Sequence, residues 1–119
     1  MKRIRTQRVY DPAESADGYR VLVDGLWPRG VKKQDLDHDE WLKGIAPSST
    51  LRRWFGHDPD RFKAFARRYR EELADNEAFE RLAGIAEERP VTLLYAAKDR
   101  EHNHAVVLAD ILTDRLNDS

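Results

Sequence analysis

The chain has 119 residues, a length that suits one domain with its own hydrophobic core. Its 21 Lys and Arg residues nearly balance 22 Asp and Glu residues, and the net charge of −1 excludes binding to DNA or lipid through a general positive field. The absence of cysteine excludes a thiol nucleophile, a Cys-ligated zinc site and a disulfide redox switch.

Two strands are expected in the first part of the chain. Residues 4–10 mix β-branched and basic side chains in a loose alternation that is typical of a strand, here one at a sheet edge. The segment 11–18 is too short to hold a crossover helix, so the first two strands are expected to be antiparallel or unusually connected. The second strand covers residues 19–26, and a Pro-Arg-Gly turn then presents Arg29.

Two short helices are expected next. Asp37 and Glu40 are three residues apart and resemble a capping box, which predicts a helix that runs from them to Ile45. A serine or threonine among residues 48–50 can cap the second helix, which Gly56 ends. Helices therefore separate the first two strands from the next strand.

Two longer helices, a strand and a last helix complete the chain. Apolar residues recur at helical spacing through residues 58–73 and 77–88. Residues 91–97 are apolar at nearly every position, which predicts a central strand buried on both faces of its sheet. The spacing from Leu108 to Leu116 then predicts a helix that packs back onto this sheet.

These elements predict an α/β fold. We expect a single small, three-layer-like domain over residues 1–119, with a short, mostly parallel sheet and packed helices. The chain start lacks the apolar run of a signal peptide, and no window approaches the roughly 18 apolar residues of a membrane span. A cytoplasmic protein without a membrane partner is therefore expected, and the oligomeric state stays open.

A polar elbow between the buried strand and the last helix is the first candidate site. In open α/β sheets, ligands lie outside the carboxyl ends of strands, where helix amino termini offer free N–H groups. Lys98 could hold a phosphate or carboxylate there, and His104 could act as an acid or base. Asp99 and Asn103 could orient a ligand, although Asp99 could equally be only the cap of the last helix.

The two histidines of the elbow also raise the question of a zinc site. His102 and His104 are two residues apart, and such residues point roughly 200° from each other around a helix. No further ligand spacing of a zinc site accompanies them. We therefore expect no metal site, and whether the protein uses a cofactor stays open.

A second group of polar residues follows the second strand. If this strand and the buried strand run parallel, their carboxyl ends open on the same edge of the sheet. Asp24 and Arg29 would then face Lys98 and Asp99. The alternative is a structural pair between Asp24 and Arg29 that only orders the turn.

A third group combines basic and aromatic residues in the segment 52–70. Arg53 and Trp54 could neutralise a phosphate and stack on a base, so this segment supports an alternative function as a nucleic-acid or partner-protein module. Acidic residues lie among the basic ones, however, as on the solvated face of an ordinary helix. His57 could be a second proton-transfer group or a residue that packs at a helix start.

Several short segments also carry a recognisable pattern: Arg8-Val-Tyr-Asp11, Tyr19-Arg-Val-Leu-Val-Asp24, Leu26-Trp-Pro-Arg-Gly30, Ala46-Pro-Ser48, Leu51-Arg52, Trp54-Phe-Gly-His-Asp-Pro59, Leu93-Leu-Tyr-Ala-Ala-Lys-Asp99 and Asn103-His-Ala-Val-Val-Leu108. They resemble the YeaO-like branch of the DUF 488 family, small bacterial proteins of unestablished function. The resemblance implies that the family's polar motifs include Arg29, Trp54, His57, Lys98, Asp99, Asn103 and His104. Where the family pattern usually has Arg, this chain has Gly25, so a potential hydrogen-bond donor to an anion is missing.

The leading hypothesis is a protein that binds or acts on a small anionic molecule in a polar cleft at the carboxyl ends of the strands. The anion would carry a phosphate or a carboxylate, and Arg29 and Lys98 would bind it. His104 or His57 would move a proton if the protein is an enzyme, which the sequence does not decide. The main alternative remains the interaction module of residues 52–70.

Overall fold

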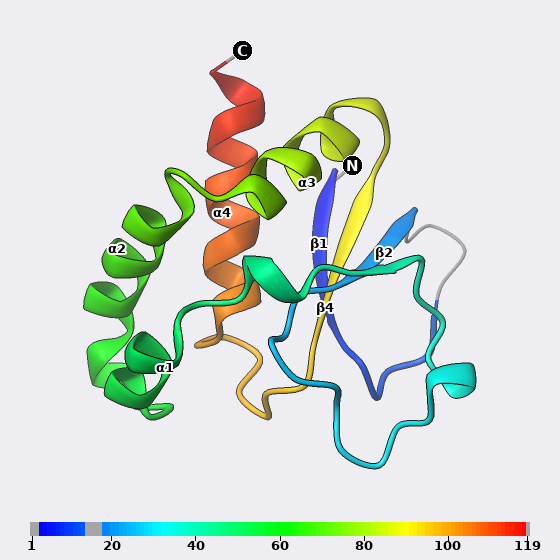
Figure 1. Cartoon of the computed structure of the whole chain (residues 1–119), viewed down its shortest axis with the longest axis horizontal. Coiled ribbons are helices and arrows are strands. Elements are labelled where there is room, and N and C mark those ends of the chain that lie inside the picture. The colour runs from blue at the N-terminus through cyan, green and yellow to red at the C-terminus, as the bar shows by residue number, and fades with distance from the viewer. Residues whose placement is uncertain (1–2, 14–17, 119) are drawn as a thin grey trace.

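A parallel four-stranded sheet organises this protein, whose computed structural model describes residues 3–13 and 18–118 (Figure 1). The strands lie in the order β1-β4-β2-β3, and every neighbouring pair is parallel. Their bounds are Ile4–Arg8 for β1, Tyr19–Leu22 for β2, Glu40–Trp41 for β3 and Val91–Tyr95 for β4.

Strand β4 is central, as its composition predicts. All five of its residues are buried, because neighbouring strands flank it on both sides and other segments cover both of its faces. Strand β1 lies at an edge, which confirms the prediction for the first strand. The predicted parallel pairing of the second strand with the buried strand is also confirmed, with Val21 opposite Leu93.

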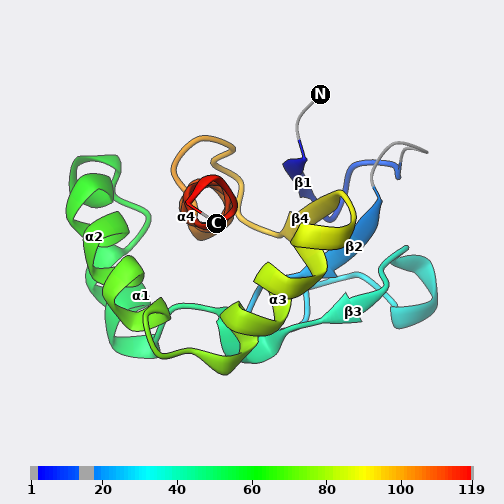
Figure 2. The ribbon, with the colours of Figure 1, turned by 90° about the horizontal axis from the view of Figure 1, so that it is seen from above.

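Four α-helices pack on one face of the sheet (Figure 2). Their bounds are Ser49–Phe55 for α1, Phe62–Leu73 for α2, Glu77–Glu88 for α3 and His104–Asn117 for α4. Helix α4 lies between the sheet and α2, so Leu108 and Leu112 on its apolar stripe are fully buried. Alternate strand residues such as Val21 and Leu93 point into this larger core.

A long irregular segment covers the other face of the sheet. It runs from β2 to β3 and contains the 3-10 helix η1 (Lys33–Asp35). Leu22 and Leu94 point toward it and pack with Leu36, and the half-buried Trp27 and Trp41 close this smaller core. The Trp41 indole N–H donates to the Asp24 carbonyl over 2.7 Å, which fixes the start of the segment against its end.

The helix predicted from Asp37 to Ile45 is wrong. Glu40 and Trp41 form strand β3 instead, paired with Val21 and Leu22, and only the 3-10 helix η2 (Lys43–Ile45) follows. The physical reason is a long-range contact, because the Asp39 carboxylate accepts the backbone N–H of Arg20 over 2.8 Å. Pairing with β2 therefore outweighs the local capping pattern.

Strands β1 and β2 run in the same direction on either side of β4, so of the two expected possibilities the antiparallel one is wrong and the unusual connection remains. The expectation that no helix fits between them concerns a segment whose residues 14–17 lie outside the described residues. The connection from β1 to β2 ends at Gly18, whose φ is +69°. A Cβ at this position would lie 2.3 Å from the Pro90 carbonyl oxygen. Only glycine allows this approach.

The structure confirms the α/β class, with a small parallel sheet and packed helices in one compact unit. Over residues 3–13 and 18–118, no helix has the length and apolar character needed to cross a membrane.

Candidate functional site

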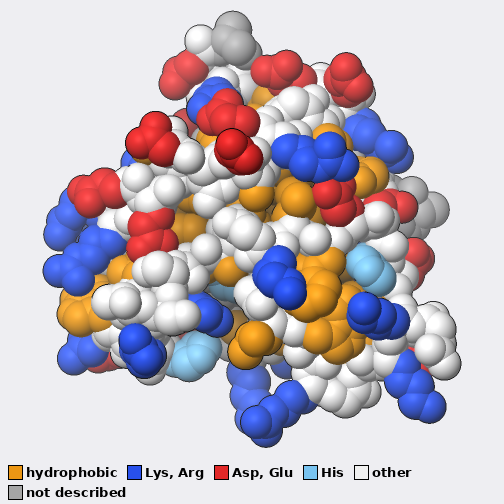
Figure 3. Space-filling model, in the orientation of Figure 1, with side chains coloured by type: hydrophobic (Ala, Val, Ile, Leu, Met, Phe, Trp, Pro, Cys, Tyr) orange, Lys and Arg blue, Asp and Glu red, His pale blue; other side chains and the backbone are white. Residues whose placement is uncertain are grey.

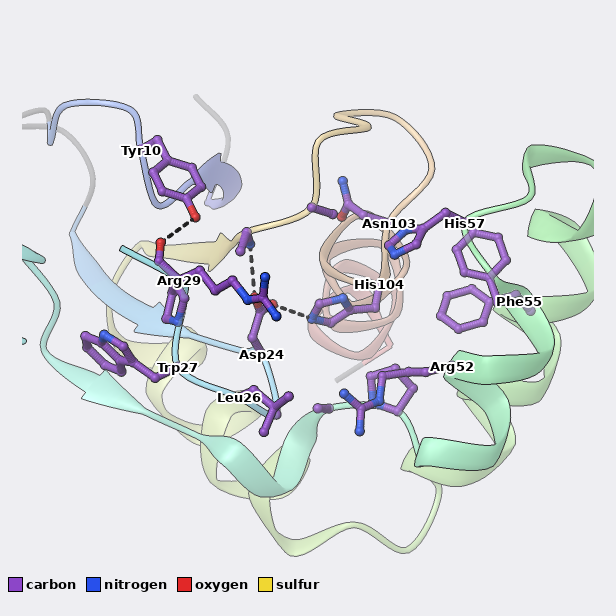
Figure 4. Close-up of a pocket in the computed structure, with 17 residues that line it drawn as sticks. Tyr10, Asp24, Leu26, Trp27, Arg29, Arg52, Phe55, His57, Asn103 and His104 are labelled. Atoms are coloured by element: carbon purple, nitrogen blue, oxygen red, sulfur yellow. Dashed lines mark hydrogen bonds and ion pairs between the residues drawn. The ribbon is translucent and has the colours of Figure 1, made fainter. Parts of the chain in front are cut away.

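A pocket of about 510 Å³ lies at the carboxyl ends of β2 and β4 (Figure 4). Asp24 and Gly25 follow β2 into it, and Ala96 and Ala97 follow β4. Helices α1 and α2, the start of α4, the turn after β2 and residues that follow β1 and η2 supply the remaining walls. Its size falls within the range of small-molecule sites, and its position follows the rule for open parallel sheets.

Asp24 and His104 form a half-buried pair in this pocket. The Asp24 Oδ1 atom lies 3.1 Å from His104 Nε2, and the two side chains are 17% and 16% exposed. The other carboxylate oxygen, Oδ2, accepts the backbone N–H of Ala96 over 3.0 Å. The carboxylate therefore joins the end of β2 to the end of β4 and to the start of α4.

The surroundings of His104 fix its tautomer. Nε2 lies 3.1 Å from the Val23 carbonyl oxygen as well as from Asp24 Oδ1, and both neighbours are acceptors. Nε2 must therefore carry the proton. Oδ1 makes no well-directed hydrogen bond because the N–H points to the Val23 carbonyl, so its contact with the ring is electrostatic. Nδ1 is the nitrogen left for a ligand, since it has no hydrogen bond within the described part of the chain.

Basic groups stand around the pocket. Arg29 lies in the turn after β2, which Gly30 closes with a φ of +74°. The Arg29 carbonyl accepts a hydrogen bond from the Tyr10 hydroxyl over 3.1 Å. Arg52 extends from α1 with an exposed side chain, and one of its nitrogens donates to the Ser49 hydroxyl over 3.2 Å. The guanidinium groups of both arginines retain N–H donors for an anion.

His57 reaches the pocket from a strained turn. Gly56 ends α1 with a φ of +54°, and His57 follows with a φ of +57°, which is uncommon for a residue other than glycine. Such conformations are often found at functional sites. The imidazole lies 6.2 Å from the Phe55 ring, at the edge of an aromatic wall.

The pocket is visible on the molecular surface. Figure 3 shows a hollow in its lower half, with basic side chains on both sides of it and apolar side chains gathered toward the right. Of the acidic and basic side chains that line the pocket, the histidines aside, Arg29 and Arg52 are basic and only Asp24 is acidic. His104 lies against this carboxylate, so the balance of charge favours an anion.

The structure brings together five of the nine candidate residues: Asp24, Arg29, His57, Asn103 and His104. Lys98, Asp99, Arg53 and Trp54 do not line the pocket. The pocket that Asp24 and Arg29 line therefore does not include Lys98 or Asp99, and the expected meeting of the two pairs is not found there.

Asp99 shapes the elbow. Its Oδ1 accepts the backbone N–H groups of Glu101 and His102 over 2.9 and 3.0 Å, and its Oδ2 lies 3.0 Å from the His102 ring. The two backbone N–H groups hold the pKa of the Asp99 carboxyl below its ordinary value. Asp99 is not the cap of the last helix, since that residue is Asn103.

Asn103 lines the pocket, but its side chain also has a structural role as the N-cap of α4. It is 2% exposed, its side-chain oxygen accepts the Val106 N–H over 3.0 Å, and its amide nitrogen donates to the Asp99 carbonyl over 2.9 Å. These bonds begin α4 at His104 and thereby place that imidazole beside Asp24.

The basic and aromatic segment presents a different surface. Arg61 and Arg68 lie over the Trp54 ring, with their guanidinium carbons 5.4 and 4.2 Å from its centroid. A stacking base would have to compete with these contacts. The geometry of Trp54 therefore gives no particular support to the nucleic-acid alternative.

Sequence reasoning considered Arg52 only as part of that basic surface, and it did not identify Leu26, Phe55 or Phe65 as pocket residues. The helical periodicity of α1 could have indicated that Arg52 lines the pocket. Leu51 and Phe55 of this helix are buried in the core, and Arg52, next to Leu51, lines the pocket. Within residues 3–13 and 18–118, no group of three or more His, Asp or Glu side chains is arranged to hold a metal ion.

Comparison with known proteins gives the chain its relatives. It is 54% identical to the uncharacterized protein YeaO of Escherichia coli over 110 residues, which cover 92% of this chain and 96% of the relative. It is 43% identical over 113 residues to the uncharacterized proteins Rv3073c of Mycobacterium tuberculosis and Mb3100c of Mycobacterium bovis, covering 95% of this chain and 96% of each relative. No solved structure matches the chain. The family model described as "Inactive DUF488-N3 subclade" matches residues 3–119, and the chain belongs to this DUF488 family.

Proposed function

We propose that this protein binds a small anionic molecule, bearing a carboxylate or a phosphate, in the pocket at the carboxyl ends of β2 and β4. The observation that supports this proposal is that Arg29, Arg52 and two histidines line one cavity. The one carboxylate that lines the cavity, Asp24, already lies against the His104 imidazole. Free guanidinium donors bind carboxylate and phosphate groups with favourable geometry.

The pair of Asp24 and His104 gives the bound molecule a proton-transfer partner. Asp24 holds the ring by its Nε2 edge, and Nδ1 can accept a proton or a hydrogen bond from a ligand. This is the arrangement that a general acid or base needs, and it also serves a protein that only binds. The proposal therefore concerns binding first, with proton transfer as the chemistry that the site can supply.

The test compares two neighbouring arginines on one helix. Arg52 lines the pocket, whereas Arg53 does not, and both side chains are exposed, so replacing either with alanine removes the same charge at little cost to folding. Wild-type protein, Arg52→Ala and Arg53→Ala would be titrated with phosphate, acetate and benzoate by calorimetry at low salt.

We expect Arg52→Ala to weaken binding about tenfold or more, the loss typical of a hydrogen bond to a charged group. Arg53→Ala should retain an affinity within about threefold of the wild type, because only long-range charge is removed. Equal losses in both variants would show a diffuse surface effect and contradict the proposal, as would an absence of anion binding by the wild type.

A further inference from the structure

The rim of the pocket exposes apolar surface. Tyr10 and Leu26 are the exposed large hydrophobic residues of the described part of the chain, at 49% and 72% exposure, and both line this pocket. In Figure 4 they lie on opposite sides of the opening, with Arg29 between them. Exposed apolar side chains at a concave site indicate a ligand that covers them.

The inner wall is also apolar. Phe55 and Phe65 stack with their ring centroids 4.3 Å apart, and both line the cavity together with Ala46 and Pro47. Neither ring carries a polar atom. A ligand that reaches past the arginines therefore meets hydrocarbon on this side.

Apart from the two imidazoles, the neutral side-chain hydrogen-bonding groups in the pocket are already occupied. Both ends of the Asn103 amide are bonded, the Trp27 N–H donates to the Val31 carbonyl over 2.5 Å, and the Tyr10 hydroxyl donates to Arg29. Among the lining residues, all of which belong to the described ranges, there is no Ser, Thr or Gln. A sugar or other polyol would lose the hydration of several hydroxyl groups, for which the side chains other than the arginines, Asp24 and the imidazoles offer no partner.

We infer that the ligand is an acid with an apolar or aromatic body, an aryl- or alkylcarboxylate, and not a sugar phosphate or a polyol. This inference rests on the proposed function, since Arg52 and Arg29 would hold the carboxylate. The body would then lie between the phenylalanine wall and the rim formed by Leu26 and Tyr10. Burial of this body and of the exposed rim would supply the remaining affinity.

The test is a homologous series of probes. Phenylacetate, 3-phenylpropionate and 4-phenylbutyrate carry the same carboxylate on a lengthening apolar chain, and ribose 5-phosphate and inorganic phosphate serve as polar anions. Calorimetry with the wild type should show affinity rising toward about fourfold for each added methylene group that is buried. Ribose 5-phosphate should bind no more tightly than inorganic phosphate.

Two variants separate the apolar contribution from the charge. Leu26→Asn should flatten the rise in affinity along the series and leave the binding of acetate within about twofold, whereas Leu26→Met should preserve the rise. Because Leu26 is 72% exposed, neither change threatens the fold.

The outcomes distinguish the two proposals. If ribose 5-phosphate binds more tightly than 3-phenylpropionate, or affinity does not change along the series, the inference about the ligand body is wrong and anion binding stands. If no anion of either kind binds the wild type, both proposals are wrong.

Discussion

The hydrogen bond from Tyr69 to Ile45 is expected to hold one wall of the pocket in place. Tyr69 is fully buried on α2, and its hydroxyl donates to the Ile45 carbonyl over 2.7 Å. Ile45 ends η2 and directly precedes Ala46 and Pro47, which line the pocket. Replacing Tyr69 with phenylalanine deletes the donor and leaves a buried acceptor unpaired, which should lower the free energy of unfolding by about 1–2 kcal/mol. For a domain of this size, the melting temperature should fall by about 5 °C per kcal/mol.

Alkaline pH gives the same variant a second, independent signature. Burial, with the negative charges of Glu72 and Asp24 as smaller causes, raises the pKa of Tyr69 far above its ordinary value of 10.0. The unfolded chain therefore ionises this phenol above pH 10, while the folded protein keeps it neutral. A raised folded pKa of this kind contributes stability that is fully present below pH 10 and is lost as the pH rises. At pH 11 the loss from Tyr69 is about 1.4 kcal/mol, so most of the deficit of Tyr69→Phe should disappear.

Urea unfolding followed by the fluorescence of the three tryptophans, at pH 8 and pH 11, measures both effects. Tyr10→Phe is the matched control, because the Tyr10 hydroxyl is on an exposed residue and its loss should change stability at pH 8 by no more than about 0.5 kcal/mol. The reasoning is refuted if Tyr69→Phe matches the wild type at pH 8, or if the difference between them is the same at both pH values.

Two further predictions concern the pocket and the elbow. At Gly25, where the family pattern usually has Arg, a Cβ would lie 3.6 Å from Arg52 Nη1 and at ordinary contact distance from Ala46. The variant Gly25→Arg should therefore fold. It should also bind inorganic phosphate about tenfold more tightly, as measured by calorimetry. Unchanged affinity would show that a cation at this position does not reach the anion. Asp99 has a lowered folded pKa, so its stabilising effect is present above its ordinary value of 3.8 and is lost as the pH falls through the folded value. Asp99→Asn should therefore reduce the drop in the urea midpoint between pH 5 and pH 3 without affecting pocket binding, and an unchanged drop would contradict this account.

Most of the fold was predictable because its main signals are local. The continuous apolar run of β4 reflects burial on both faces, and the stripes of α2, α3 and α4 reflect one buried side each. Strand β3 was not predictable in this way, since two residues become a strand only by pairing with Val21 and Leu22. The capping pattern at Asp37 and Glu40 is a weak local preference that this pairing overrides.

The site was predictable as a region and less well residue by residue. The polar elbow, residues 98–104, lies at the pocket, yet only its last two residues, Asn103 and His104, line the cavity. Lys98 and Asp99 come at the start of a turn in which the Asp99 carboxylate accepts the backbone N–H groups of Glu101 and His102. The direction of the side chains in such a turn depends on these backbone hydrogen bonds. A sequence shows which residues are polar, but it does not show which of them a tight turn directs inward.

The lining residues also decide what kind of chemistry the pocket can support. Within the described ranges that line it, no Ser, Thr or Lys side chain is present, and the chain has no Cys, so covalent catalysis would require a carboxylate, an imidazole or the Tyr10 phenol as nucleophile. Asp24 is poorly placed for this, because one of its oxygens accepts the Ala96 N–H and the other is buried beside His104. His104 is held by Nε2 and offers only Nδ1. This lining fits the proposed binding of a small acid, with His104 as the group placed to move one proton in that proposal.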